Sequence, residues 1–208
     1  MTELTARTVS SHRAIVAGVD EAGRGPLAGP VITAAVILDD ACPIDGLRDS
    51  KQLSSRQRSV LARLIRQRAV CFAVAYASPV EIDEMNILHA TLLAMKRAVD
   101  RLPTTPTRVR IDGNQSFKSD DVPLQYEVET VIRGDQSVAA ISAASILAKV
   151  CRDRLMLRWH RTFPAYGFDR NKGYPTRMHL RALEEFGPSP IHRYSFAPVQ
   201  RAQARLAG

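Results

Sequence analysis

The chain has few cysteines and no long hydrophobic run. Its three cysteines, Cys42, Cys71 and Cys151, are odd in number and match no zinc or redox spacing, so we expect reduced thiols in a cytoplasmic protein. The longest apolar stretch, residues 30–38, is far too short to cross a bilayer. Residues 1–13 are polar and lack the apolar core of a signal peptide, so we expect no secretion signal and a flexible N-terminus.

The sequence also has no internal repeat and no low-complexity segment. Hydrophobic residues make up 45% of the 208 positions and charged residues 24%, which is enough apolar surface for a normal core. A chain of this length predicts one large domain, or one domain with a small appendage.

Positive charge is unevenly distributed along the chain. The formal net charge is +8, and residues 150–208 alone carry eleven Lys or Arg against four Asp or Glu. A one-sided surplus of this kind is typical of proteins that bind a phosphate backbone. A solvated basic surface with no partner is the alternative that charge alone leaves open.

Hydrophobic periodicity predicts a mixed α/β fold. The predicted order begins with two strands and continues with strands joined through helices, and in such sheets functional residues lie at strand ends. A short helix is also predicted after Pro79, and a proline-rich tail is predicted to about residue 199. Strands are expected at 14–20, 31–38, 70–77, 109–112 and 126–133, and helices at 54–68, 88–101, 137–161 and 176–186.

Residues 15–31 are the most informative segment of the sequence. An apolar, β-branched run ends in two adjacent carboxylates, Asp20 and Glu21, and a glycine-rich turn carrying Arg24 follows at once. An unpaired buried charge is expensive, and a bound metal ion would compensate it. Because side chains alternate along a strand, the two acids can point together only if the chain bends there, and the glycines would allow that bend.

Two further acids occupy similar positions. Asp112 ends a predicted strand before a glycine, and Asp135 follows a strand and a glycine. If the first strand lies beside the strand that ends at Asp112, the carboxylates converge. Turn-forming roles for Asp112 and Asp135 are the alternative, since Asp is common in turns.

Four carboxylates in one cleft would resist ionising together, and divalent cations would relieve their repulsion. Carboxylate oxygens without thiolate or imidazole partners favour Mg²⁺ or Mn²⁺ over zinc. Two such ions can activate a water and stabilise a leaving oxygen in phosphodiester hydrolysis. The general acid for that oxygen is not identifiable from the sequence.

The motifs of the chain resemble those of the type 2 ribonucleases H, specifically the bacterial ribonuclease HII family, from about residue 15 to residue 199. No position that the family uses for chemistry departs from its pattern. The motifs are residues 18–30 (GVDEAGRGPLAGP), 49–54 (DSKQLS), 86–88 (NIL), 111–114 (IDGN), 134–135 (GD), 143–150 (AASILAKV), 152–153 (RD), 172–176 (KGYPT) with His179, 192–193 (HR) and 195–199 (SFAPV).

The resemblance implies a ribonuclease H-like fold, a mixed five-stranded sheet flanked by helices with a C-terminal helical extension. It places a catalytic domain at 14–161 and a substrate-binding helical region and tail at 162–208. Asp20, Glu21, Asp112 and Asp135 match the family's four catalytic, metal-binding carboxylates. The implied reaction is endonucleolytic hydrolysis of RNA in an RNA–DNA hybrid, and incision at the 5′ side of a single ribonucleotide in duplex DNA, leaving 5′-phosphate and 3′-hydroxyl ends.

Substrate-binding residues follow from the same resemblance. Residues Gly23, Arg24 and Gly25 match the loop that reads the ribose 2′-hydroxyl and the adjacent phosphate. Tyr174 matches the tyrosine that stacks near the nucleotide after the ribonucleotide. Ser50 and Lys51 are expected to contact phosphate.

Several tempting residues have simpler interpretations. His179 and His192 have no cysteine or second histidine at ligand spacing, so neither is predicted to bind zinc, although His179 could orient its own loop. Asp153 is predicted to form a local ion pair, and Trp159 to lie in the core.

The sequence therefore predicts a monomeric, cytoplasmic ribonuclease H that uses Mn²⁺ or Mg²⁺ and makes no membrane contact. Two alternatives stay open. One is another metal-dependent nuclease on the same fold, which the fold alone would permit. The other is a hybrid-binding module without catalysis, which four carboxylates facing phosphate argue against.

Overall fold

A single five-stranded sheet forms the centre of the molecule. The computed structural model describes residues 14–47, 53–117 and 124–207. The strand order is β3-β2-β1-β4-β5, with β1 antiparallel to β2, β2 antiparallel to β3, and β1, β4 and β5 parallel. The mixed five-stranded sheet predicted from the sequence is confirmed. The strands are β1 (Val16–Ala22), β2 (Val31–Ile37), β3 (Cys71–Ala77), β4 (Arg108–Asp112) and β5 (Glu127–Val131).

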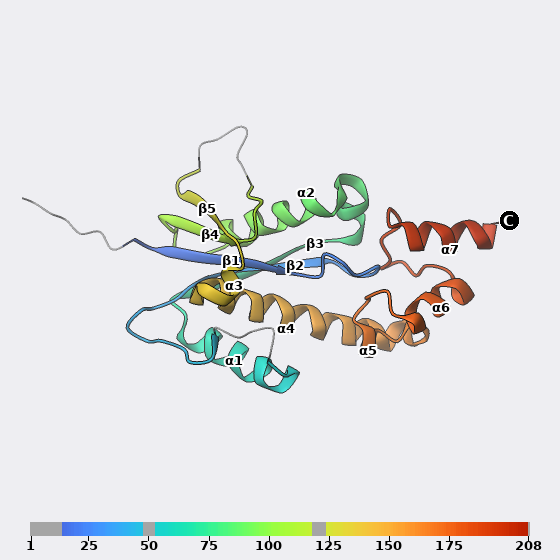
Figure 1. Cartoon of the computed structure of the whole chain (residues 1–208), viewed down its shortest axis with the longest axis horizontal. Coiled ribbons are helices and arrows are strands. Elements are labelled where there is room, and N and C mark those ends of the chain that lie inside the picture. Colours follow the sequence, from blue (N-terminus) through green and yellow to red (C-terminus); the bar gives the residue numbers. More distant parts are fainter. Residues whose placement is uncertain (1–13, 48–52, 118–123, 208) are drawn as a thin grey trace, which may run out of the picture.

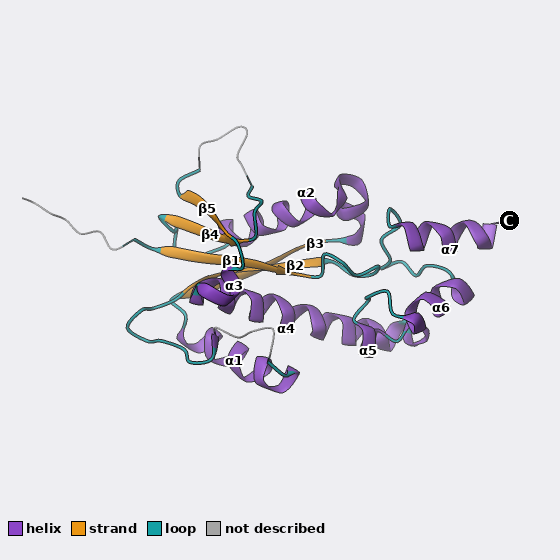
Figure 2. Cartoon of the chain, in the orientation of Figure 1, coloured by secondary structure: helices purple, strands orange, loops and turns teal. Residues whose placement is uncertain are grey.

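Helices cover both faces of this sheet. Figure 1 shows α2 on one face and α1 and α4 on the other, with the C-terminal helices beyond one end of the sheet, and Figure 2 shows the same layers by type of structure. The helices are α1 (Ser55–Arg68), α2 (Pro79–Asp100), α3 (Gly134–Ser137), α4 (Ala139–Thr162), the 3₁₀ turn η2 (Pro164–Tyr166), α5 (Phe168–Asn171), α6 (Arg177–Phe186) and α7 (Ala197–Ala207).

Strand β2, which lies between β3 and β1, shows that the sheet is covered on both faces. All seven of its residues are buried. Ala34 and Val36 pack with α1 and α4, whereas Ala35 and Ile37 pack with α2. Successive side chains of a strand point to opposite faces, so a strand covered on both sides has an uninterrupted apolar sequence.

Helix α4 lies unusually close to β1. A Cβ atom on Gly18 would lie only 2.2 Å from the carbonyl carbon of Ala140, so no larger residue fits at that strand position. The first turns of α4 are rich in alanine, and Ala143 and Ala144 are fully buried. This close approach brings the start of α4 alongside the strand that carries Asp20 and Glu21.

Several boundaries differ from the sequence predictions by one or more residues, and three differences bear on the arrangement of the fold. Strand β1 continues to Ala22, two residues beyond the predicted end. The helices predicted on either side of residue 86 form one element, α2, which is interrupted at Asn86 by a left-handed backbone (φ 69°).

The third difference is at the C-terminus, where the predicted proline-rich tail to about residue 199 gives way to a helix at residue 197. Residues 197–207 form helix α7. Pro198 is in its first turn, where the missing N–H has no partner to lose, so the proline does not prevent the helix. Val199 and Ala202 are buried against the apolar cluster that includes Leu183 of α6. No helix in the described ranges is both long and apolar enough to span a membrane.

Candidate active site

The register between β1 and β4 places two of the predicted acids side by side. The parallel pairing runs as far as Val19 opposite Ile111. The next residues on the two strands are Asp20 and Asp112, so both lie at the same edge of the sheet. Asp20 is 5% exposed, and Asp112 is half-buried.

Asp20 and Glu21 remain in the strand rather than at its end. Ala22 still pairs with Ile32 of β2, and the chain turns only at Gly23, whose φ is +100°. The predicted bend therefore lies after the two acids and not between them. The Glu21 amide donates a hydrogen bond to Asp20 Oδ1 at 2.7 Å, which holds the Asp20 carboxylate against the backbone of its neighbour.

Asp135 comes to the same edge from a helix and not directly from a strand. It lies in the first turn of the short helix α3, after β5, and is 1% exposed. Its backbone N–H donates to Asp112 Oδ1 at 3.4 Å. Gly134 precedes it because a Cβ there would lie 2.5 Å from Cδ1 of Ile141.

Burial and mutual repulsion both act on these acids. Desolvation raises the pKa of Asp20 well above its usual value, and the charges of Glu21 and Asp112 raise it further. The pKa of Glu21 is also raised by burial and by Asp112, and it is lowered by Arg24. The cluster therefore carries negative charge that the protein compensates only in part, which is the condition in which a divalent cation binds favourably.

The donor atoms fit magnesium or manganese. All four predicted ligands are carboxylates, which these hard cations prefer. Within the described ranges, however, no three His, Cys, Asp or Glu side chains are gathered into a ready-made metal group.

A cleft of about 440 Å³ opens beside Glu21. It is lined by the predicted loop residues Gly23, Arg24 and Gly25 and by Tyr174, so the structure brings these sequence-distant segments together. Arg24 is half-exposed, and its Nη1 lies 3.7 Å from Glu21 Oε1. The predicted residues Ser50 and Lys51 lie outside the described residues.

Sequence reasoning missed several residues of this cleft. Ser145, Lys149 and Arg152 line it from α4, and Arg58 lines it from α1. The first three are spaced i, i+4 and i+7, so they form one polar stripe on a helix that is otherwise rich in small apolar residues. That stripe is a signal that the sequence offered, whereas nothing local distinguishes Arg58.

A buried arginine, Arg193, holds the loop that lines the cleft. Its side chain is fully buried, and it donates to the carbonyl oxygens of Gly23, Arg24 and Gly29 at 2.5, 2.7 and 2.8 Å. Burial lowers the pKa of Arg193 to about 9. Three carbonyl partners compensate the buried guanidinium, and they fix the backbone on both sides of the turn.

A second buried arginine, Arg152, joins this loop to the segment that carries Tyr174. It donates to Ala28 O at 3.0 Å, Pro30 O at 3.2 Å and Lys172 O at 2.9 Å, and its guanidinium carbon lies 5.9 Å from the centre of the Tyr174 ring. Burial lowers its pKa to about 10. Ala28 and Lys172, which are 144 positions apart in the sequence, are thus bonded to one side chain.

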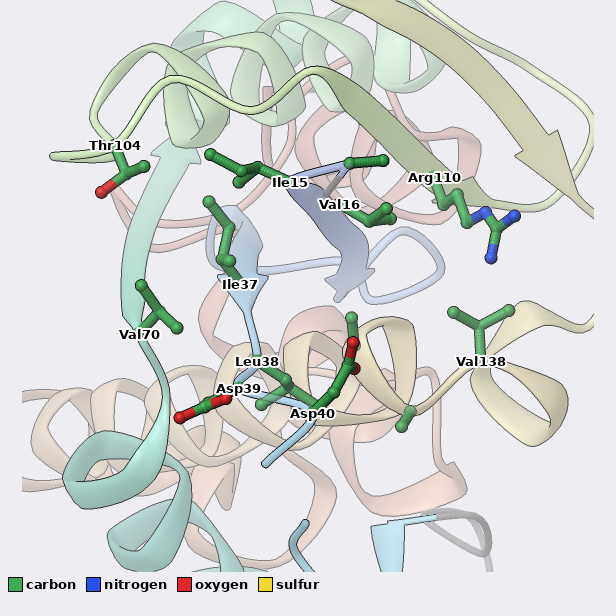
Figure 3. Close-up of a pocket in the computed structure, with 13 residues that line it drawn as sticks. Ile15, Val16, Ile37, Leu38, Asp39, Asp40, Val70, Thr104, Arg110 and Val138 are labelled. Carbon is green, nitrogen blue, oxygen red and sulfur yellow. The ribbon is translucent and has the colours of Figure 1, made fainter. Parts of the chain in front are cut away.

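The molecule has a second hollow, of about 480 Å³, at the opposite end of β1. Figure 3 shows Ile15, Val16 and Ile37 among its mostly aliphatic lining, with Asp39 and Asp40 on the loop after β2. It contains none of the four predicted carboxylates and neither substrate loop. The cleft beside Glu21 is therefore the candidate active site.

The sheet order, the flanking helices and the acidic edge define a protein of the ribonuclease H-like class. Solved structures share this fold. The ribonuclease H2 from Pyrococcus horikoshii OT3 aligns with a TM-score of 0.77 at 30% identity, covering 92% of this chain and 98% of that one. Bst-RNase HIII, crystallised in complex with Mn²⁺, aligns with a TM-score of 0.73 at 20% identity over 92% of this chain and 70% of that one, a likeness of fold alone.

The sequence comparisons are more specific. The family model of Ribonuclease HII matches residues 17–199. The ribonuclease HII of Burkholderia ambifaria is 57% identical over 194 residues, which are 93% of this chain and 87% of that protein. The chain therefore belongs to the ribonuclease HII family and is a ribonuclease H, a hydrolase that acts on RNA paired with DNA.

Proposed function

We propose that this enzyme hydrolyses the RNA strand of RNA–DNA hybrids and also incises at the 5′ side of single ribonucleotides embedded in duplex DNA. The products would carry 5′-phosphate and 3′-hydroxyl ends. The observation that supports the proposal is the position of the acidic edge, which adjoins one cleft lined by both the Gly23–Gly25 loop and Tyr174.

Asp20, Glu21, Asp112 and Asp135 are the residues that would hold Mn²⁺ or Mg²⁺. Bound there, two such ions would supply an activated water and stabilisation of the leaving 3′-oxygen. Glu21 lines the cleft, while Asp20 is held behind it by the Glu21 amide. The Mn²⁺ complex of Bst-RNase HIII, a protein of the same fold, is consistent with this choice of metal.

The loop and the tyrosine would select the substrate. The 2′-hydroxyl is the group that distinguishes RNA from DNA at a given nucleotide, and the exposed backbone at Gly25 lets a ribose approach closely. Arg24 presents a guanidinium that can hold a phosphate through two hydrogen bonds. Tyr174 is 42% exposed and lies across the cleft, where its ring can stack on the following nucleotide.

The remaining predictions belong to the same proposal. Ser50 and Lys51 would contact substrate phosphate, and Lys149 of the cleft has the charge to do so as well. The enzyme would act as a cytoplasmic monomer on RNA–DNA hybrids and on duplex DNA that contains ribonucleotides.

Cleavage of a labelled DNA duplex that carries one ribonucleotide, with Mg²⁺ or Mn²⁺, tests the proposal. We expect incision 5′ to the ribonucleotide by the wild type, loss of incision in Asp112→Asn, and no cleavage of an all-DNA duplex. Asp100→Asn is a matched control, because Asp100 is exposed and pairs only with Lys96 at 2.6 Å in the described contacts.

The two alternatives give different results in the same assay. Cleavage of the all-DNA duplex would favour another nuclease activity on this fold. Binding of the hybrid that is equally tight with and without metal, with no cleavage by the wild type, would favour a binding module. Either result would overturn the proposed activity.

A further inference from the structure

Two buried histidines form a hydrogen-bonded chain that ends at the tyrosine of the cleft. His192 Nδ1 lies 2.9 Å from the Ser189 amide nitrogen and 2.8 Å from Ser189 Oγ. His192 Nε2 lies 3.0 Å from His179 Nε2, and His179 Nδ1 lies 2.9 Å from the carbonyl oxygen of Tyr174. We refer to Ser189, His192, His179 and the Tyr174 carbonyl as the histidine relay.

The partners allow one arrangement of protons in this relay. A backbone N–H can only donate, so His192 Nδ1 must accept from Ser189, and His192 carries its proton on Nε2. That proton is donated to His179 Nε2, which leaves the His179 proton on Nδ1. A carbonyl oxygen can only accept, and the Nδ1–H of His179 points at the carbonyl of Tyr174.

The surroundings keep both rings neutral. His179 and His192 are fully buried. The rings of Tyr166 and Phe168 pack against them, with ring centres 4.9 Å (Tyr166) and 5.8 Å (Phe168) from that of His192. Burial lowers the pKa of both histidines, that of His192 to about 4. At neutral pH the relay therefore consists of two neutral imidazoles with fixed tautomers.

We propose that His192 and His179 are positioning residues for Tyr174, and that His192 acts by fixing the tautomer of His179. This inference rests on the proposed function, because it gives Tyr174 a role in substrate recognition. Without the proton of His192, His179 can move its own proton to Nε2. Its Nδ1 lone pair would then face the Tyr174 carbonyl oxygen, and the two acceptors would repel each other.

The position of Tyr174 is sensitive to such a change. The ring lies next to the substrate loop, since a Cβ built on Gly25 would be 3.7 Å from Tyr174 Cε1. The Tyr174 carbonyl also accepts from the Thr176 amide at 2.8 Å, so it holds the turn that leads into α6. A shift of this turn would move the ring relative to the loop that faces it.

Two substitutions of His192 separate positioning from general support of the fold. In His192→Gln, the amide nitrogen occupies the place of Nε2 and can still donate to His179. In His192→Asn, the amide oxygen occupies the place of Nδ1 and can accept from Ser189, but the donor to His179 is lost. Both variants remove the ring, so a purely structural role predicts similar effects for both.

We expect His192→Asn to lower kcat/KM on the single-ribonucleotide duplex about fivefold, the worth of one neutral hydrogen bond, and His192→Gln to stay within about twofold of the wild type. The same pair is then compared in a Tyr174→Ala background. There the two variants should cleave at the same rate, because the group that the relay positions is gone. Unfolding midpoints are measured for all variants, and rates are taken well below them.

The proposal would be overturned if His192→Asn and His192→Gln lowered kcat/KM equally. It would also be overturned if the loss in His192→Asn persisted in the Tyr174→Ala background. Nitrogen-15 spectra of the imidazoles give a readout without substrate, in which we expect Nε2–H on His192 and Nδ1–H on His179. Any other tautomer pair would also overturn it. If the wild type cleaves no hybrid, the proposed function fails, and the Asn and Gln variants are then compared by their affinity for the same duplex.

Discussion

Gly23 lies directly against the guanidinium group of Arg152, and a Cβ atom at Gly23 would be 2.0 Å from Arg152 Nε. Arg152 has no room to retreat, because it is buried and bonded to three carbonyl oxygens. Gly23 also has φ +100°, which other residues adopt only with strain. Only glycine therefore fits at position 23 of the loop that faces the substrate.

Gly23→Ala is expected to destabilise the fold by about 2 kcal/mol or more, because overpacking and backbone strain act together. Hybrid cleavage should fall with it, since Arg152 and the loop move apart. Chemical denaturation measures the first effect, and single-turnover cleavage in Mg²⁺ measures the second.

Gly25→Ala is the matched control in the same loop. Its Cβ would meet Tyr174 Cε1 at 3.7 Å, an ordinary contact, and the structure gives this glycine no positive φ. We expect an unfolding free energy within about 0.5 kcal/mol of the wild type. A loss of stability at Gly25 as large as that at Gly23 would contradict the packing argument.

Local patterns were sufficient to predict the strands, whereas the five-stranded sheet was expected from the family resemblance. The strands were found because β-branched and apolar runs bounded by turn residues are a local signal, and β2 is apolar throughout because it is covered on both faces. The sequence analysis expected Asp20 and Asp112 to lie close together if their strands were adjacent, and the register between β1 and β4 places them side by side. The catalytic roles of these acids stay predictions.

Hydrogen bonds from side chains to distant backbone carbonyl oxygens could not be predicted from local patterns. Arg193 binds carbonyl oxygens about 170 positions earlier in the chain, and every residue has such an oxygen, so the sequence carries no sign of the pairing. Helix α7 was missed for a different reason. Its first residues were assigned to a proline-rich tail that reached about residue 199, although the first turn of a helix tolerates proline.

Asp20→Asn is expected to stabilise the metal-free protein while abolishing cleavage. The pKa of Asp20 is raised in the folded state, so its charged form lowers the stability of the fold at neutral pH, and a neutral amide removes that penalty. A higher unfolding free energy than that of the wild type is therefore expected for Asp20→Asn in EDTA.

Added Mn²⁺ should reverse this order. The wild type should gain stability on binding the ion, whereas Asp20→Asn should gain little because a ligand is missing. Thermal unfolding in EDTA and in Mn²⁺ measures both effects, with Asp100→Asn as the exposed control. A wild-type midpoint that does not respond to Mn²⁺ would argue against a metal site at this edge.

Acid should destabilise the fold through His192. Its pKa falls from 6.5 to about 4 in the folded protein because burial, and to a smaller extent His179, disfavour the charged form. The unfolded chain thus binds a proton at a higher pH than the folded chain does. The contribution of His192 is therefore complete above about pH 6.5 and is lost as the pH falls toward 4.

The non-titrating variant His192→Gln isolates this effect. Between pH 7.5 and 4.5 the wild type should lose about 2 kcal/mol more unfolding free energy than His192→Gln does, as the difference between the two pKa values requires. His89→Gln is the control, since His89 is exposed and its ring bonds within its own helix to Met85 O and Asn86. If this loss of stability occurs but the cleavage rate that depends on Tyr174 does not change, His192 supports the fold without positioning Tyr174. Parallel pH curves for the wild type and His192→Gln would show that folding does not lower the pKa of His192, and the argument from burial would then be wrong.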